Sequence, residues 1–256
     1  MGQADRPVGD LPRLVVVDST NLSSYQAHLL SRRAADALAV AVEAERRWQV
    51  TPRRQVRRET DARGFSLPLS AAHAQLLGDV LNAGFALRGT IGSCEVADDG
   101  AKVKLSLAVE LMDVRTGEAV WSDTQETTAR ASGGEMPVVD LKVGEALADV
   151  AEATARKLPT FRRVKGMVYA LLRKREALVN LGRRHGLKKG LELPVYRESY
   201  DEDRRATTLT EVGRVRVVEV QPTDSTVHIL KGSQPLERRD VIHALLPVPL
   251  PRGTRP

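Results

Sequence analysis

Hydrophobic and polar residues alternate strictly over Lys102–Leu111, near the middle of the chain. Every odd-numbered residue of this stretch is Val or Leu, and the even-numbered residues are Lys, Ser, Ala and Glu. A period of two is typical of a strand with one buried face. Asp98–Gly100 and Arg115–Glu118 supply tight turns, because Gly tolerates the positive φ that hairpin turns need. We therefore predict a three-stranded meander over Gly84–Arg130, with one apolar face that must be covered.

Other patterns before residue 160 predict the elements that cover this meander. Leu14–Val17 is a continuous apolar run, which is typical of a strand buried on both faces. Trp48–Val50 predicts a short strand, and Thr51 and Pro52 predict the N-cap and first residue of a small helix. Apolar residues at helical spacing predict longer helices over residues 24–47, 70–81 and 138–158. The expected fold class is α+β, an α/β sandwich with helices covering a mixed sheet that contains the antiparallel meander.

The pattern changes after Pro159, which ends the last predicted helix. Short runs rich in Val, Leu and Tyr then alternate with glycines, which predicts a small all-β barrel with a solvated hairpin tip at Asp201–Arg205. The expected organisation is a flexible leader over residues 1–12, an α/β sandwich domain over 13–160, a β-barrel domain over 161–246 and a proline-rich tail over 247–256.

Composition narrows the classes of function. Hydrophobic residues make up 42% of the 256 residues, enough for packed cores. Aromatic residues make up only 4%, which argues against nucleic acid as the partner, because base-stacking platforms need exposed aromatic rings. Residues 1–160 hold 19 Lys and Arg against 22 Asp and Glu, a net charge of −3, whereas residues 161–256 hold 20 against 11, a net charge of +9. The second domain is therefore the half expected to attract anions.

Motifs of catalysis are absent from the sequence. It contains no P-loop, no GxGxxG, no GxSxG and no HExxH, its five histidines have no ligand spacing, and its single cysteine cannot form an internal disulfide. We therefore predict no catalytic residue, no cofactor, no metal site and no enzymatic activity. The alternative is an enzyme site at the Asp18–Asn21 loop, beyond the first strand, where α/β sheets tend to bind ligands.

Two basic clusters are the candidate binding surface. The first has a spacing of i, i+1, i+4 and i+5 on the small helix, where one face could hold phosphates or carboxylates. The second lies on a loop between strands of the barrel. Both could equally be solvated surface charges, the first paired with nearby acidic residues. The nine residues are Arg53, Arg54, Arg57, Arg58, Arg183, Arg184, His185, Lys188 and Lys189.

Residues of the first domain resemble a family of bacterial envelope domains. Leu14–Asp18 with Asn21, Leu87–Ile91, and above all Asp113–Trp121 carry the resemblance. The family contains the curli secretion channel subunit, the amino-terminal domain of the Tol-system periplasmic protein, the lipoprotein activators of penicillin-binding proteins and the middle domain of the flagellar ring-assembly protein. The secretion channel inserts long hairpins to cross the outer membrane, so the tight turns expected here argue against a pore.

The second domain resembles the carboxyl-terminal β-barrel of the flagellar ring-assembly protein. Gly166–Val168, Asn180–Gly182, Gly186–Arg197, Gly213–Val217 and Asp240–Ile242 carry this resemblance. That protein's own amino-terminal domain has no counterpart in the sequence.

The paired resemblance implies a non-enzymatic accessory or scaffolding component of a cell-envelope assembly, whether flagellar, pilus, secretion or peptidoglycan-associated. It would dock onto other proteins, such as a ring or secretion complex, and a homo-oligomer is compatible with this role. The sequence has no integral membrane span and no signal peptide at its start. We therefore expect the periplasm or cell envelope if an export signal has been removed, and the cytoplasm otherwise. The alternative function is binding of a polyanion or nucleic acid by the arginine-rich clusters.

Overall fold

The computed structural model describes residues 11–25, 29–97, 102–130, 139–172, 175–201, 205–230 and 234–248. Its contacts divide the chain into two compact units, Met1–Thr160 and Phe161–Pro256, which are described separately. The expected turn at Asp98–Gly100 lies outside the described residues. So do most of the expected leader, hairpin tip and tail.

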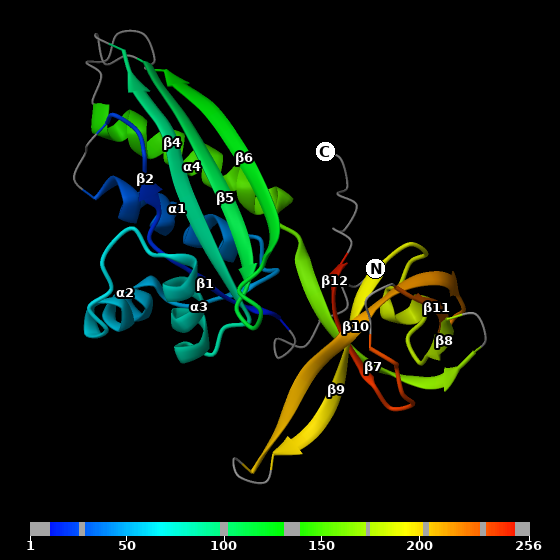
Figure 1. Ribbon diagram of the computed structural model, residues 1–256. Helices are drawn as coiled ribbons and strands as arrows, with labels where there is room; N and C mark the ends of the chain where they lie inside the picture. The colour runs from blue at the N-terminus through cyan, green and yellow to red at the C-terminus, as the bar shows by residue number, and fades with distance from the viewer. Residues whose placement is uncertain are drawn as a thin grey trace, which may run out of the picture. The chain divides into compact units, whose positions relative to one another are not determined.

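Unit 1 is built on a six-stranded mixed sheet (Figure 1). Its strands are β1 (Arg13–Val16), β2 (Thr20–Asn21), β3 (Gln49–Val50), β4 (Phe85–Val96), β5 (Lys102–Asp113) and β6 (Ala119–Arg130). The order is β3-β1-β4-β5-β6, with β2 paired to β4. The pairs around β1 are parallel, and β4, β5 and β6 form an antiparallel meander, which confirms the expected α+β class.

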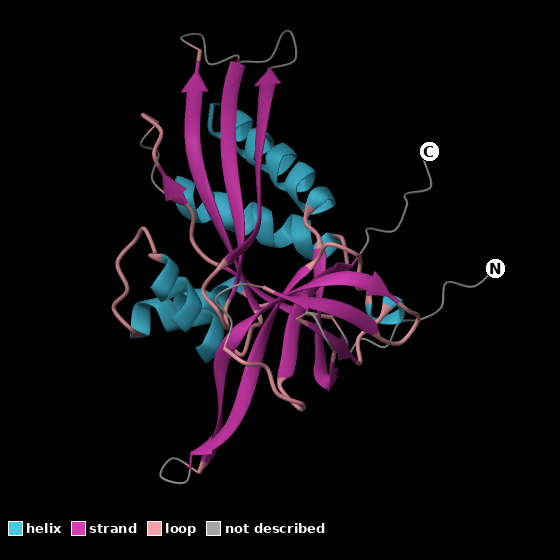
Figure 2. Cartoon of the chain, turned by 45° about the vertical axis from the view of Figure 1, so that its right-hand side comes forward, coloured by secondary structure: helices cyan, strands magenta, loops and turns pink. Residues whose placement is uncertain are grey.

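Four helices cover this sheet: α1 (Leu30–Ala44), α2 (Arg53–Ala62), α3 (Ala71–Val80) and α4 (Val139–Lys157). Helices α1 and α4 lie along one face (Figures 1 and 2). Helices α2 and α3 pack on the other face, where their apolar side chains form a cluster with Val15, Val17, Ala86 and Met112. The continuous apolar run of β1 is explained by this arrangement, because helices cover both of its faces.

The helix boundaries differ from the sequence predictions at their starts. Helix α1 begins at Leu30 rather than at residue 24, and the chain at Thr20 and Asn21 forms β2, which the sequence did not predict. Helix α2 begins at Arg53, and its N-cap is Pro52, with no capping side chain. The prediction that Thr51 is the N-cap is therefore wrong. Ser70 does cap α3, because its Oγ accepts a hydrogen bond from the His73 N–H at 3.1 Å.

The register of the meander matches the alternation in the sequence. The odd-numbered residues of β5 from Val103 to Leu111 are all buried. The turn between β5 and β6 places Gly117 at φ 72°, and the Gly117 N–H donates to the Asp113 carbonyl at 2.8 Å. This left-handed conformation is the one that glycine tolerates best, so the prediction of a turn at Arg115–Glu118 is confirmed.

Unit 2 consists of six strands in the closed order β10-β11-β8-β7-β12-β9. The strands are β7 (Thr160–Leu171), β8 (Glu176–Val179), β9 (Glu192–Asp201), β10 (Ala206–Val220), β11 (Ser225–Ile229) and β12 (Val241–Val248), with a 3-10 turn, η2, at Arg183–His185. Their inward residues form one buried cluster that includes Val168, Val195, Val215 and Ile242. Strand β12 runs to Val248.

An ion pair between the half-buried Arg197 of β9 and the buried Asp240, which precedes β12, joins these two strands. The Arg197 guanidinium donates from Nε and Nη2 to the two carboxylate oxygens of Asp240, each at 2.9 Å. Asp240 is 3% exposed and also accepts from the Glu237 N–H at 2.7 Å. The hydrogen bond to Asp240 raises the pKa of Arg197 above its ordinary value. This bidentate pair therefore has a structural role.

Candidate functional site

The first basic cluster lies on α2, and we call it the α2 cluster. Two of its arginines face neighbouring elements of unit 1, and two face outward. Its members are Arg53, Arg54, Arg57 and Arg58. Arg53 lies at the first turn of α2, beside the end of β1, and its side chain is only 10% exposed. It forms an ion pair with Asp18 through Nη2, donates to the Val16 carbonyl through Nη1, and donates to Asp36 on α1 at 2.9 Å through Nε. Each of the three guanidinium nitrogens of Arg53 therefore has a partner within unit 1.

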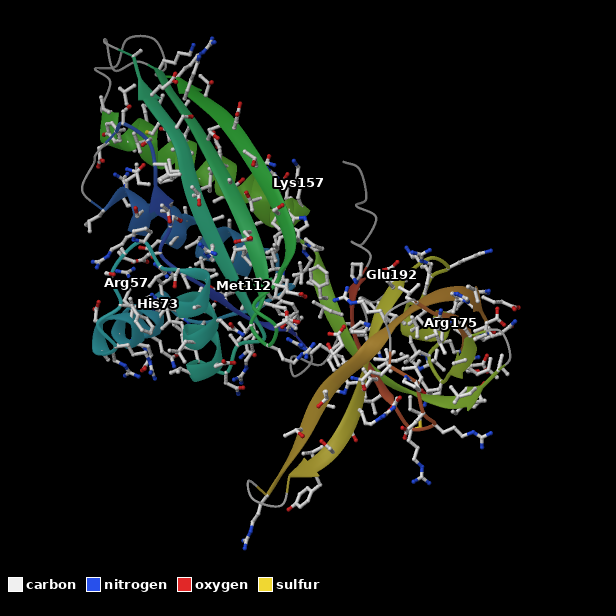
Figure 3. All side chains as sticks on the ribbon, viewed as in Figure 1. Arg57, His73, Met112, Lys157, Arg175 and Glu192 are labelled. Carbon is white, nitrogen blue, oxygen red and sulfur yellow. The ribbon has the colours of Figure 1, made fainter. Side chains whose placement is uncertain are left out.

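Arg57 lies one turn further along α2 (Figure 3). It joins the same network through Asp36. Its Nη2 donates to both carboxylate oxygens of Asp36 at 2.9 Å. Asp18 also has a second cation, since Arg32 Nε lies 3.5 Å from its Oδ2. The network ties α1 to α2, which cover opposite faces of the sheet, so it holds the layers of unit 1 together.

Arg54 and Arg58 point away from this network and are exposed. Arg58 has a weak contact with its neighbour Glu59 at 3.4 Å, which is worth little in water. The hypothesis that four guanidinium groups share one binding face is therefore wrong for Arg53 and Arg57. Those two are held by carboxylates of neighbouring elements, and two separate surface charges remain.

The same network gives the Asp18–Asn21 loop a structural role. Asp18 is 8% exposed, and its carboxylate oxygens are occupied by Arg53 and Arg32. Asn21 accepts from the Ser23 N–H at 3.0 Å and donates to the Tyr25 carbonyl at 2.9 Å, which closes the loop. The alternative of an enzyme site gains no support from these contacts.

The second basic cluster, which we call the barrel cluster, lies on the loop Arg183–Lys189 of unit 2. Backbone hydrogen bonds join this loop to the neighbouring chain segment. The Arg183 and Arg184 N–H groups donate to the carbonyls of Gln221 and Pro222, at 2.9 and 3.0 Å. His185 Nδ1 accepts from the Gly182 N–H at 3.0 Å. Gly182 packs so closely that a Cβ there would lie 2.5 Å from the Gln221 carbonyl oxygen. The loop is therefore a rigid support for its side chains.

A cleft of about 600 Å³ opens beside this loop, which we call the lysine cleft. It is lined by Arg183, Gly186, Leu187, Lys188, Lys189, Val218, Glu219 and Val220. Within the described part of the chain, no carboxylate lies within ion-pair distance of Arg183, Arg184, Lys188 or Lys189. His185 faces the Gly182 backbone and does not line the cleft.

The two basic clusters belong to different units of the chain. Sequence reasoning found the cations of the lysine cleft but missed its other wall, Val218–Val220. That wall lies beside an irregularity in the pairing of β10 with β11, between Val217 and Glu219. No motif in the sequence signals this irregularity, because Val-Val-Glu-Val is also compatible with a regular strand.

A third surface is the half of the unit 1 sheet that α2 and α3 do not reach. On this face Met112 is covered, whereas Lys104, Thr124, Glu126 and Thr128 further along the strands are exposed. We call this surface the open sheet face. It consists of Thr90, Ser93, Glu95, Lys104, Ser106, Ala108, Ser122, Thr124, Glu126 and Thr128. A shallow groove of about 460 Å³ crosses it between β4, β5 and β6.

Metal-binding groups of His, Cys, Asp and Glu are absent from the described residues. Among the described helices, none is long and apolar enough to cross a membrane. Cys94 is buried in β4, and this burial raises the pKa of its thiol.

Comparison with protein families gives one match, which lies in the first half of the chain. Residues 5–127 match the model of the peptidoglycan-synthase activator LpoB. The match covers just under half of the chain and ends within β6, so it does not extend to the barrel. No curated protein sequence matches the chain.

Comparison with solved structures gives matches of low sequence identity that cover about half of the chain. The lipoprotein GNA1162 from Neisseria meningitidis has 16% identity and a TM-score of 0.41, covering 55% of this chain and 98% of its own. The PelC dodecamer from Paraburkholderia phytofirmans has 16% identity and a TM-score of 0.38, covering 56% and 87%. The LpoB carboxyl-terminal domain from Escherichia coli has 18% identity and a TM-score of 0.37, covering 45% and 82%.

Proposed function

We propose that this chain is a non-enzymatic accessory protein of the bacterial cell envelope, which binds a peptidoglycan synthase through unit 1 and alters its activity. The match of residues 5–127 to the LpoB family model carries the proposal. The matched segment runs from before β1 into β6, so it contains nearly the whole sheet. The location that fits this role is the periplasm.

The open sheet face is the docking surface that we infer for the synthase. It is the part of the sheet on which, among the described elements, no helix packs, and its side chains are small or charged. Arg88 and Glu110 form an ion pair of 3.3 Å at its border, which limits the surface on the side of α3. A flat, polar surface of this kind suits a regulatory contact that forms and dissociates.

The barrel then serves as a second docking module. The resemblance of its sequence to the barrel of the flagellar ring-assembly protein supports this part of the proposal. Its net charge differs in sign from that of unit 1, so the two units are suited to different partners.

Binding to peptidoglycan synthases purified from the same organism tests the proposal. Thr124→Arg places a large charge on the open sheet face, midway along its edge strand β6, and should weaken binding roughly tenfold. Ala148→Arg is the matched control, because Ala148 is exposed on α4, which covers the opposite face. It should bind as the wild type does. If the wild type binds none of the organism's synthases, the proposed function is wrong.

A further inference from the structure

Strand β10 extends past the end of its partner β9 at the lysine cleft. The register between the two strands ends at Arg216 and Glu192. The next residue, Val217, is bonded to the loop instead: its carbonyl accepts from the Gly190 N–H at 2.8 Å, and its N–H donates to the Leu191 carbonyl at 2.9 Å. Residues 218–220 then continue along the wall of the cleft with no residue of β9 opposite them.

The cleft combines an apolar wall with cations on a fixed support. Val218 and Val220 are half-buried, and Leu187 beneath the loop is 2% exposed. Lys188, Lys189 and Arg183 are exposed at the rim. Arg183 Nη2 also donates to the Val220 carbonyl at 3.3 Å, which closes one end of the cleft. A ligand lying along β10 would therefore contact the apolar side chains of Val218 and Val220, and it would lie close to the positive charges of the rim.

We propose that the lysine cleft binds an extended acidic peptide segment of a partner protein, in which apolar side chains alternate with carboxylates. Side chains of an extended peptide point alternately to opposite sides. Apolar side chains can then pack on Val218 and Val220 while the carboxylates reach Lys188 and Lys189. Addition of an extended peptide beside a strand is a common mode of peptide recognition. This inference concerns unit 2 and does not depend on the proposed contact of unit 1 with a synthase.

The composition of the cleft favours a peptide over a nucleic acid. No aromatic residue lines it, so bases would have nothing on which to stack. Glu219 also lies in the lining, where it would repel an uninterrupted row of phosphates. Gln221 Nε2 holds this carboxylate by donating to Glu219 Oε1 at 2.8 Å. A peptide can avoid the negative charge by placing an apolar or amide side chain opposite it.

Fluorescence anisotropy with a labelled seven-residue peptide of alternating glutamate and valine tests this inference on the full chain. We expect saturable binding that weakens as salt is added, because the contacts include exposed ion pairs. Lys188→Glu combined with Lys189→Glu should weaken binding roughly tenfold. Arg162→Glu combined with Arg238→Glu is the matched control. It makes the same change in net charge at exposed residues that do not line the cleft, and it should bind as the wild type does.

Three results would overturn the inference. The first is equal weakening by the control pair, which would mean that only net charge matters. The second is equal affinity for a seven-residue oligoglutamate, which would mean that the apolar wall contributes nothing. The third is tighter binding of a single-stranded oligonucleotide at the same residues. Amide chemical shifts of the wild type provide a check that needs no variant. With the glutamate–valine peptide they should change at Arg183 and at residues 186–191 and 218–220, which form the cleft and the loop beside it, and not on the opposite side of unit 2.

Discussion

The two basic clusters contain similar residues but differ in what surrounds them. Arg53 on α2 faces Asp18, Asp36 and the end of β1, and its charge is neutralised inside unit 1. Lys188 and Lys189 on the barrel loop face a cleft, and among the described residues no carboxylate pairs with them. One cluster therefore stabilises a fold, whereas the other is available to a partner.

The difference arises from the elements beside each cluster. Asp18 follows β1 directly, and α2 follows β3, the parallel neighbour of β1, so the topology brings Arg53 and Asp18 to the same end of the sheet. The barrel loop is instead anchored mainly by backbone hydrogen bonds, and within the described part of the chain no carboxylate forms an ion pair with Lys188 or Lys189. Clusters of cations in a sequence thus indicate binding only where neighbouring elements bring no carboxylates.

The largest expected effect is the loss of the buried network. Arg53→Met should lower the free energy of unfolding of unit 1 by about 3 kcal/mol, because it leaves the Asp18 carboxylate buried with only the longer Arg32 contact. Chemical denaturation measures this change. Arg54→Met, at an exposed neighbour on the same helix, should change the free energy by less than about 0.5 kcal/mol. Equal effects of the two substitutions would contradict the structural role of Arg53.

A smaller effect is expected at the support of the barrel loop. Gly182→Ala should lower the free energy of unfolding of unit 2 by roughly 2 kcal/mol, because the new methyl group would overlap the backbone at Gln221 and Asp224. Thermal unfolding measures it. Gly92→Ala is the control, since its methyl group would lie 3.6 Å from Ser106 Oγ, an ordinary contact. A Gly182 variant as stable as the wild type would mean that the loop is not rigidly anchored.

Almost no effect on stability is expected at the rim of the lysine cleft. The combined Lys188→Glu and Lys189→Glu variant should keep the free energy of unfolding within about 0.5 kcal/mol of the wild type. Both side chains are exposed, and neither has an ion-pair partner among the residues that the structure describes. The same denaturation experiment measures this. A decrease in the free energy of unfolding as large as that of Arg53→Met would mean that the two lysines, like Arg53, stabilise the fold.

Thiol labelling distinguishes the two faces of the unit 1 sheet without any change in stability. Burial raises the pKa of Cys94, so its thiol stays protonated to higher pH and should react slowly in the folded protein. A cysteine introduced by Thr124→Cys on the open sheet face should react rapidly under the same conditions. Comparable rates for the two cysteines would mean that the face assigned as covered is accessible.

Much of the fold could be predicted from the sequence because its signals are local. The alternation along β5 and the glycine of the turn after Asp113 depend on neighbouring residues only, so the meander was predicted correctly. Strand β2 was missed because it has two residues, Thr20 and Asn21, which also favour turns.

The candidate site depends on contacts between distant segments, which no local pattern records. Asp18 lies 35 positions before Arg53 in the chain, and the placement of α2 against β1 decides whether Arg53 contacts this carboxylate or water. The wall of the lysine cleft at Val218–Val220 similarly depends on where β9 ends relative to β10.

The most direct test of the proposed function is the rate of glycan polymerisation by a purified peptidoglycan synthase from the same organism, measured with and without this chain. We predict that the wild-type chain and the Ala148→Arg variant change the rate to the same extent, and that Thr124→Arg loses most of this effect. A rate that is unchanged by saturating wild-type chain, for every synthase of the organism, would contradict the proposal.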